Sequence, residues 1–323
     1  MSTLFGSRIM STKYELPGDF HDTLISKYED AIANDHIKFN GKSAVNEIIH
    51  ELTDGAKIDF QLTLLESLEH RPEKGDKELN PFEKPEPELT IVSNYGRQDE
   101  LKLVYNKFPV VPYHFLMVTK EFISQNTPLS SSELMSMYTI LKSLEHNHED
   151  EWFSFFNCGN ESGASQPHKH VQFMTLPKNF VPYPQRLAMN SEPFIPTAKS
   201  EPLQNPNLPF AHFVARLPES DFDEDDLSMY FAALLQRTMT VLRDNGANHI
   251  SYNFIMTTNY MLMVPRSHSH YKNLGINSCG VLGLILCKNK DLFSMVKQDG
   301  AINVLKDVCF PSTAGQKSDE YDY

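Results

Sequence analysis

Apolar positions along the chain switch between the spacing of helices and the spacing of strands, which predicts a protein of mixed α and β structure. Apolar residues recur three or four positions apart in three long segments, which we predict as helices: residues 19–34, 130–146 and 224–244. Shorter apolar or alternating runs predict strands at residues 89–92, 101–105, 115–118, 152–156, 168–176, 210–217, 251–256 and 260–264. Further along, residues 278–287 are predicted as an apolar strand and residues 292–308 as one or two helices.

A proline-rich segment divides the chain into two parts. Eight prolines lie between residues 177 and 209, a density typical of an irregular connection. We therefore predict one domain over residues 1–190 and a second over residues 200–323. Both parts contain a strand, a helix and a strand in that order, and Leu-Met-Val occurs within residues 113–120 and again within residues 259–266. The repetition suggests a duplicated α+β unit.

Composition narrows the class of partner. The 323 residues carry a formal net charge of -13 and contain no basic run, so we expect neither nucleic acid nor a membrane surface as a partner. Four cysteines without paired short spacing are expected to be free thiols in a reducing compartment. The first residues are polar and lack the apolar segment of a signal peptide. We therefore expect an intracellular protein of the cytoplasm, with the nucleus as a second candidate compartment.

The segment from Asn157 to Gln172 concentrates the candidate chemistry. It reads Asn-Cys-Gly-Asn-Glu-Ser-Gly-Ala-Ser-Gln-Pro-His-Lys-His-Val-Gln. Its first part is small and polar, and such a loop can present several backbone N–H groups to one anion. Its second part alternates as a strand, which places His168, His170 and Gln172 on one face. Two imidazoles and an amide thus follow directly after a candidate phosphate-binding loop.

Three interpretations compete for this face: a histidine nucleophile that attacks phosphorus, a half-site for a metal, and ordinary polar residues on an exposed strand. A zinc site does not need a glycine- and serine-containing loop before it, and the sequence offers no clear third and fourth ligand. Phosphoryl transfer does need donors placed around the phosphate oxygens. The loop therefore favours the nucleophile.

The pattern Asn-x-Gly-x-x-x-Gly-x-Ser-x-x-His-x-His-x-Gln resembles the signature of the histidine-triad superfamily, in the transferase branch where Gln replaces the third His. That branch contains galactose-1-phosphate uridylyltransferase and the fungal diadenosine tetraphosphate phosphorylases. Lys169 stands where the uridylyltransferases usually have Pro, which favours the phosphorylases. The resemblance implies an α+β, histidine-triad-like fold with two related halves, each an antiparallel sheet flanked by helices. The first half would be catalytic, and the second would be the ATP adenylyltransferase half.

The resemblance also implies roles for individual residues. His170 would be the nucleophile, with its ring N–H held by the backbone carbonyl of His168. The expected substrate-binding residues around it are Asn157, Gly163, Ser165, His168 and Gln172. Three more contacts are expected further away: Asn106 with ribose hydroxyls, and Arg71 and Lys288 with the polyphosphate. For Asn106 a plain turn before proline is an equal alternative, and for Arg71 and Lys288 the alternative is a solvated surface position.

The implied reaction is phosphorolysis of diadenosine tetraphosphate, in which phosphate is consumed and ATP and ADP are formed through an AMP–histidine intermediate. A divalent cation, Mg²⁺ or Mn²⁺, is expected on the substrate. If the two halves pack as a pseudo-dimer, a monomer would suffice. Two alternatives remain from the sequence: a hexose-1-phosphate uridylyltransferase, or a nucleotide-binding protein without enzymatic activity.

Overall fold

The computed structural model describes residues 14–39, 41–53, 55–66, 80–145, 150–197 and 200–316. Its longer helices are α1 (Phe20–Ala33), α2 (Ser131–Glu145) and α4 (Glu224–Asp244), and shorter ones are α3 (Tyr183–Met189), α5 (Ser278–Leu282), α6 (Lys290–Asp299) and α7 (Ala301–Val308). The three long helices predicted from apolar spacing are confirmed. Ser130 caps the N-terminus of α2, because its Oγ accepts from the Glu133 N–H and the Glu133 carboxylate accepts from the Ser130 N–H.

Eight strands form one antiparallel sheet in the order β3-β4-β5-β7-β6-β9-β10-β8. Their bounds are β3 (Thr90–Tyr95), β4 (Leu101–Tyr105), β5 (Phe115–Thr119), β6 (Trp152–Cys158), β7 (His170–Thr175), β8 (Phe213–Arg216), β9 (Tyr252–Met256) and β10 (Tyr260–Pro265). The sheet is continuous from the first half of the chain into the second, because β6 pairs with β9. The α+β class and the antiparallel sheets flanked by helices are thereby confirmed.

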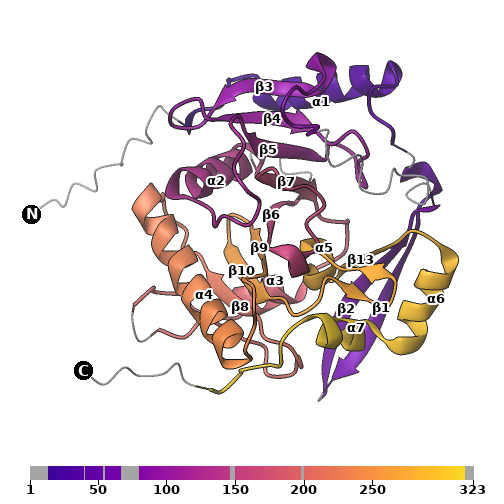
Figure 1. Cartoon of the computed structure of the whole chain (residues 1–323), viewed down its shortest axis with the longest axis vertical. Coiled ribbons are helices and arrows are strands. Elements are labelled where there is room, and N and C mark those ends of the chain that lie inside the picture. The colour runs from indigo at the N-terminus through magenta and orange to yellow at the C-terminus, as the bar shows by residue number, and fades with distance from the viewer. Residues whose placement is uncertain are drawn as a thin grey trace, which may run out of the picture.

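Different helices pack on the two faces of this sheet. Helices α1, α2 and α4 pack on one face and share a core with Phe115, Phe173 and Phe254. On the other face, α3, α5, α6 and α7 contribute to a second core with β6, β9 and β10, in which Phe155 and Leu262 are buried. Figure 1 shows α2 and α4 on one side of the sheet and α6 and α7 on the other. Over β4 and β5 the second face carries only a small apolar cluster with Phe82 among the described residues.

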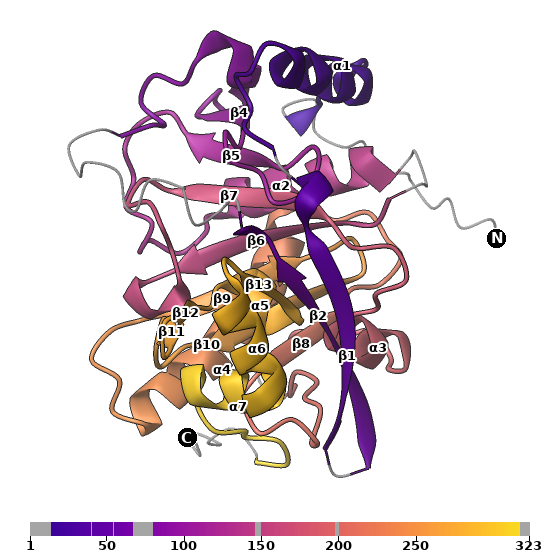
Figure 2. The ribbon, with the colours of Figure 1, turned by 90° about the vertical axis from the view of Figure 1, so that its right-hand side faces the viewer.

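A smaller sheet joins the two ends of the chain. It has the order β1-β2-β13, from β1 (Val45–Thr53), β2 (Ala56–Leu64) and β13 (Leu284–Cys287), and β13 runs parallel to β2. Figure 2 shows the long β1–β2 hairpin beside α6. A two-stranded pair, β11 (His270–Tyr271) and β12 (Leu274–Gly275), completes the strands, and short turns of 3-10 helix lie at Gly41–Ser43, Pro87–Leu89 and Asn160–Ser162.

The predicted strand over residues 278–287 is wrong in its first half. Residues Ser278–Leu282 form helix α5, and only Leu284–Cys287 are extended. Asn277 caps the helix, since its side-chain oxygen accepts from the Cys279 and Gly280 N–H groups. Gly283 ends it with φ of 106°, a left-handed value that favours glycine. The apolar run is a helix, a turn and a strand, which together bring the chain against β6 and β9.

The internal repeat also needs a correction. The Leu-Met-Val match pairs β5 with β10, whereas the sheet order is related about the β6–β9 pair, so β10 corresponds to β7 and β8 to β5. His114 directly precedes β5, and His212 directly precedes β8 in the same way. The repeat therefore runs as strand, helix, strand, strand in both halves, with β8, α4, β9 and β10 in the second. Among the described residues no helix is long and apolar enough to cross a membrane.

Candidate active site

The pleat of β7 sorts the candidate residues onto one face. Val171 and Phe173 belong to the core under the helices α1, α2 and α4. His170 and Gln172 therefore point to the opposite face. His168 comes just before the strand, and the Phe82 ring packs against both His168 and His170, with ring centroids 5.9 and 5.1 Å apart. The three polar side chains predicted to share a face do share it, on the side that carries the Phe82 cluster.

His170 is held as a neutral base with one nitrogen fixed. Its Nδ1 lies 2.8 Å from the backbone oxygen of His168, so Nδ1 carries the proton and donates. This is the hydrogen bond that the resemblance implied. The residue is 3% exposed, and burial lowers the pKa of its imidazole to about 4. Near neutral pH the ring is therefore uncharged, and its Nε2 holds the free lone pair that a nucleophile requires.

His168 uses both ring nitrogens within the protein. Nε2 donates to the backbone oxygen of Thr119 at 2.8 Å, and Nδ1 accepts from the Asn80 amide at 2.8 Å. Burial lowers the pKa of its imidazole as well. Its backbone carbonyl meanwhile orients His170. The geometry thus gives His168 a positioning role, and the predicted direct contact of its ring with substrate would require one of these bonds to break.

Gln172 is oriented by His114. The His114 Nε2 lies 2.9 Å from the Gln172 Oε1, and because a carbonyl oxygen only accepts, the imidazole donates. The Gln172 amide nitrogen is thereby turned away from His114. The amide nitrogen is a neutral donor on the face of His170, and the substrate contact of Gln172 stays a prediction.

Asn157, at the end of β6, is held through its oxygen. Its Oδ1 accepts from Asn253 Nδ2 at 2.8 Å and from both the backbone N–H and the hydroxyl of Ser278, at 3.0 and 2.7 Å. The side chain is 3% exposed. No described residue accepts from its amide nitrogen, so the end of Asn157 left for a ligand is a donor. The substrate contact of Asn157 stays a prediction.

The glycines of the loop are needed for close packing of the two halves. Gly163 has φ of 79°, and a Cβ there would lie 2.5 Å from the Ile276 carbonyl oxygen. Gly159 has φ of 88°, and a Cβ would lie 2.1 Å from the Ile250 oxygen. Beyond Gly163, the backbone N–H groups of residues 164–166 donate to no described residue. Ser165 is exposed to solvent within this stretch, and its substrate contact stays a prediction.

The more distant predictions have mixed outcomes. Asn106 forms a turn in which its Oδ1 accepts from the Phe108 N–H at 3.0 Å. The alternative interpretation of Asn106, as a turn residue before a proline, is therefore confirmed. The ribose contact uses the other end of the amide and stays a prediction. Lys288 is exposed directly after β13, and its phosphate contact also stays a prediction. Arg71 lies outside the described residues.

Three residues around the histidines were missed from the sequence. Gln125 accepts from the His170 backbone N–H through Oε1 and donates to the Asn157 carbonyl through Nε2, both at 2.8 Å. Asn80 holds His168, and Phe82 lies over His170. All three come from irregular segments far away in sequence, so no local spacing marks them.

Lys169 points away from this site. It is 3% exposed and lies between the two histidines, but on the helix-covered side. Its Nζ contacts the Glu133 carboxylate at 2.6 Å and the Pro128 carbonyl oxygen at 2.8 Å. Lys169 therefore anchors the start of β7 to the first turn of α2 through a buried ion pair.

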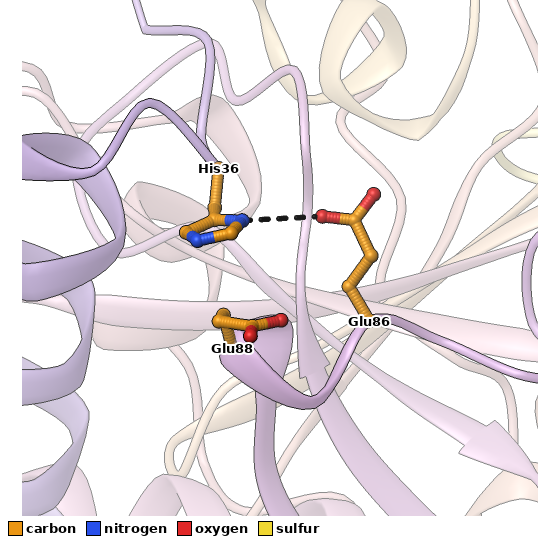
Figure 3. Close-up of side chains that lie close together, drawn as sticks. All are labelled: His36, Glu86 and Glu88. Carbon is orange, nitrogen blue, oxygen red and sulfur yellow. Dashed lines mark ion pairs between the residues drawn. The ribbon is translucent and has the colours of Figure 1, made fainter.

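Among the described residues, one group of three side chains places potential metal ligands within 4.8 Å of one another: His36, Glu86 and Glu88 (Figure 3). His36 Nδ1 lies 3.5 Å from Glu86. Glu86 also pairs with Lys107, and the lysine lowers the pKa of the carboxyl group. Because Glu86 already has a cationic partner and the group lies at the surface, we assign no metal to it.

The chain is similar to known proteins over almost its whole length. Residues 20–192 match the model of the Ap4A phosphorylase N-terminal domain, and residues 206–311 match that of the ATP adenylyltransferase C-terminal domain, where Ap4A is diadenosine tetraphosphate. Two Saccharomyces cerevisiae proteins are each 36% identical: Protein APA1, with 95% of this chain and 99% of that protein covered, and diadenosine 5',5'''-P1,P4-tetraphosphate phosphorylase 2, with 92% and 96% covered.

Solved structures give the same result. Yeast Ap4A phosphorylase Apa2 superimposes with a TM-score of 0.84 at 35% identity, over 96% of this chain and 100% of that one. Its complex with Ap4A superimposes with a TM-score of 0.82 at 33% identity, over 93% of this chain and all of that one. The first-domain match alone spans more than half of the chain, and the fold agrees throughout. The chain therefore belongs to the Ap4A phosphorylase family.

Proposed function

We propose that this protein catalyses the phosphorolysis of diadenosine tetraphosphate to ATP and ADP, and the reverse adenylyl transfer, through an AMP–His170 intermediate. The observation that carries the proposal is the state of His170. It is buried, neutral and fixed at Nδ1, and it lies beside a loop whose free groups are donors. The similarity to yeast enzymes named for this substrate supports the choice of reaction.

In the first step the His170 Nε2 lone pair attacks the α-phosphorus of one adenosine. A bond forms from Nε2 to phosphorus, and the bond from phosphorus to the bridging oxygen breaks, so ATP leaves with that electron pair. The His168 carbonyl stabilises the positive charge that develops on the imidazole, because its oxygen accepts a hydrogen bond from the Nδ1–H group. Asn157 and the free N–H groups of the loop donate to the non-bridging oxygens.

In the second step inorganic phosphate attacks the same phosphorus, the bond from phosphorus to Nε2 breaks, and ADP forms. Gln172 differs here from a third histidine, because its neutral amide donates a hydrogen bond and has no proton to give up. Phosphate is a better second nucleophile than water at this site, because it is negatively charged and its oxygens accept hydrogen bonds from the donors of the site. The intermediate therefore persists until phosphate attacks it, as a transferase requires.

A divalent cation, Mg²⁺ or Mn²⁺, would enter as part of the substrate and shield its phosphates. Among the described residues, the side chains that contact His168 and His170 are amides, a hydroxyl and aromatic rings, rather than the carboxylates such cations prefer. The site residues thus fit a cation carried on the phosphates. We also propose that one chain acts alone, since both halves of the sheet come from it.

The experiment is a product analysis with radiolabelled inorganic phosphate, diadenosine tetraphosphate and Mg²⁺. We expect ATP and ADP in equal amounts, with the label in ADP only. Unlabelled ADP, or AMP with ATP, would mean hydrolysis and would overturn the proposal. A parallel reaction with a uridine diphosphate sugar and a hexose phosphate tests the sister activity, for which no turnover is expected.

A further inference from the structure

The residue opposite Asn157 in the sheet comes from the second half of the chain. Asn157 and Asn253 are direct partners in the β6–β9 pair that joins the halves. Asn253 is fully buried, and its amide nitrogen donates both to Asn157 Oδ1 and to the Ser162 carbonyl, each at 2.8 Å. One side chain of the second half therefore holds both the start and the middle of the loop that leads to His170.

Behind Asn253 lies a buried arginine. Arg266 is 1% exposed, and its Nη1 donates to Asn253 Oδ1. Its Nε donates to the Val308 carbonyl at 3.1 Å, and its Nη2 donates to the His268 carbonyl at 2.7 Å. No described carboxylate forms an ion pair with it. A buried guanidinium is costly without its hydrogen bonds, so these three bonds fix its position.

The order of donors and acceptors runs in one direction. A guanidinium can only donate, so Asn253 must present its oxygen to Arg266 and its amide nitrogen to Asn157. Asn157 must then present its oxygen to Asn253, and the Ser278 N–H and hydroxyl donate to that same oxygen. The amide nitrogen of Asn157 is left facing the site. Linked hydrogen bonds polarise one another, so the charge of Arg266 also strengthens this donor.

We propose that Asn253 and Arg266 are positioning residues, which set Asn157 as a hydrogen-bond donor to the α-phosphate through a relay of two amides. The role in catalysis rests on the proposed function. It gives the second half, which has no His-x-His after a loop of this kind, a specific task in the first half's site. Ser278, at the start of α5, supplies the second clamp on the same oxygen.

Two substitutions test the relay. Asn253→Asp keeps an acceptor for Arg266 but removes the donor to Asn157 and Ser162, and Ser278→Ala removes only the hydroxyl. Ser154→Ala is the matched control, because Ser154 is also fully buried on β6 and donates to a backbone carbonyl, that of Met256, away from the loop. Each variant is compared with wild type in urea unfolding, in AMP binding by calorimetry, and in the single-turnover rate of ATP release from diadenosine tetraphosphate without phosphate.

A misdirected donor should slow ATP release by roughly 10- to 100-fold in Asn253→Asp and less in Ser278→Ala. AMP binding should weaken roughly tenfold in Asn253→Asp. Ser154→Ala should unfold at lower urea but keep both properties. Wild-type rates and affinities in the two relay variants, or equal losses in Ser154→Ala, would overturn the proposal. If wild type releases no ATP, the proposed function fails, and AMP binding alone then decides the relay. If Asn253→Asp does not fold, Ser278→Ala decides.

Discussion

Lowering the pH should leave the first half-reaction almost unchanged well below the ordinary pKa of histidine. Attack on phosphorus needs the neutral form of His170, and burial lowers the pKa of this imidazole to about 4. At about pH 5 an imidazole of ordinary pKa would be neutral in only about 3% of molecules. A pKa of about 4 leaves about 90% of His170 neutral at that pH. The two cases differ by about 30-fold in rate at about pH 5.

The assay is the single-turnover release of ATP from diadenosine tetraphosphate between about pH 8 and about pH 5. Inorganic phosphate is left out because it titrates in this range itself. Circular dichroism at each pH confirms that the protein is folded. A rate that falls by less than about twofold agrees with the pKa of about 4. A rate that falls about tenfold for each pH unit below about 6.5 would show that His170 titrates as an ordinary histidine and that burial does not lower its pKa.

Three further predictions follow from the buried groups. His170 and His212 both have a pKa lowered to about 4 by burial. As the pH falls, the unfolded chain therefore binds protons at these two residues at a higher pH than the folded chain does. Stability is then full above about pH 6.5 and falls by up to about 3 kcal/mol per histidine as the pH drops towards about 4, which urea unfolding at several pH values measures. Lys169→Met leaves Glu133 without its buried partner and should cost about 3–5 kcal/mol of unfolding free energy; addition of Glu133→Gln should restore part of it, and no loss in the single variant would contradict this. Phe82→Ala uncovers His170 and should raise the ratio of AMP to ADP among the products at fixed phosphate; an unchanged ratio would show that the ring does not shield the intermediate from water.

The site could be predicted from the sequence as far as local spacing reaches. Strand alternation is enough to place His168, His170 and Gln172 on one face, and the small residues before them mark a tight loop. The contacts that define the chemistry are not local. Asn80 lies 88 positions from His168, and Gln125 lies 45 positions from His170. Such pairs are brought together only by the folded sheet, so spacing along the chain carries no sign of them.

Two errors have identifiable physical causes. In the 278–287 segment, apolarity alone does not distinguish a buried strand from a buried helix, and the signals that decide are Asn277 as a cap and Gly283 as a stop. In the internal repeat, a match of three apolar residues fits any buried strand. The His-Phe pairs at residues 114–115 and 212–213, each directly before or at the start of a strand, mark the true correspondence.

Trapping the covalent intermediate would show whether AMP becomes attached to His170. The protein is incubated with adenine-labelled diadenosine tetraphosphate without phosphate, quenched, and mapped by peptide mass spectrometry. We expect an acid-labile, base-stable adenylyl group on the peptide that contains His170. The group should be absent in His170→Ala, although that variant still binds the substrate, and phosphate should release it as ADP. Turnover by His170→Ala, or an adenylyl group on another residue, would mean that His170 is not the nucleophile.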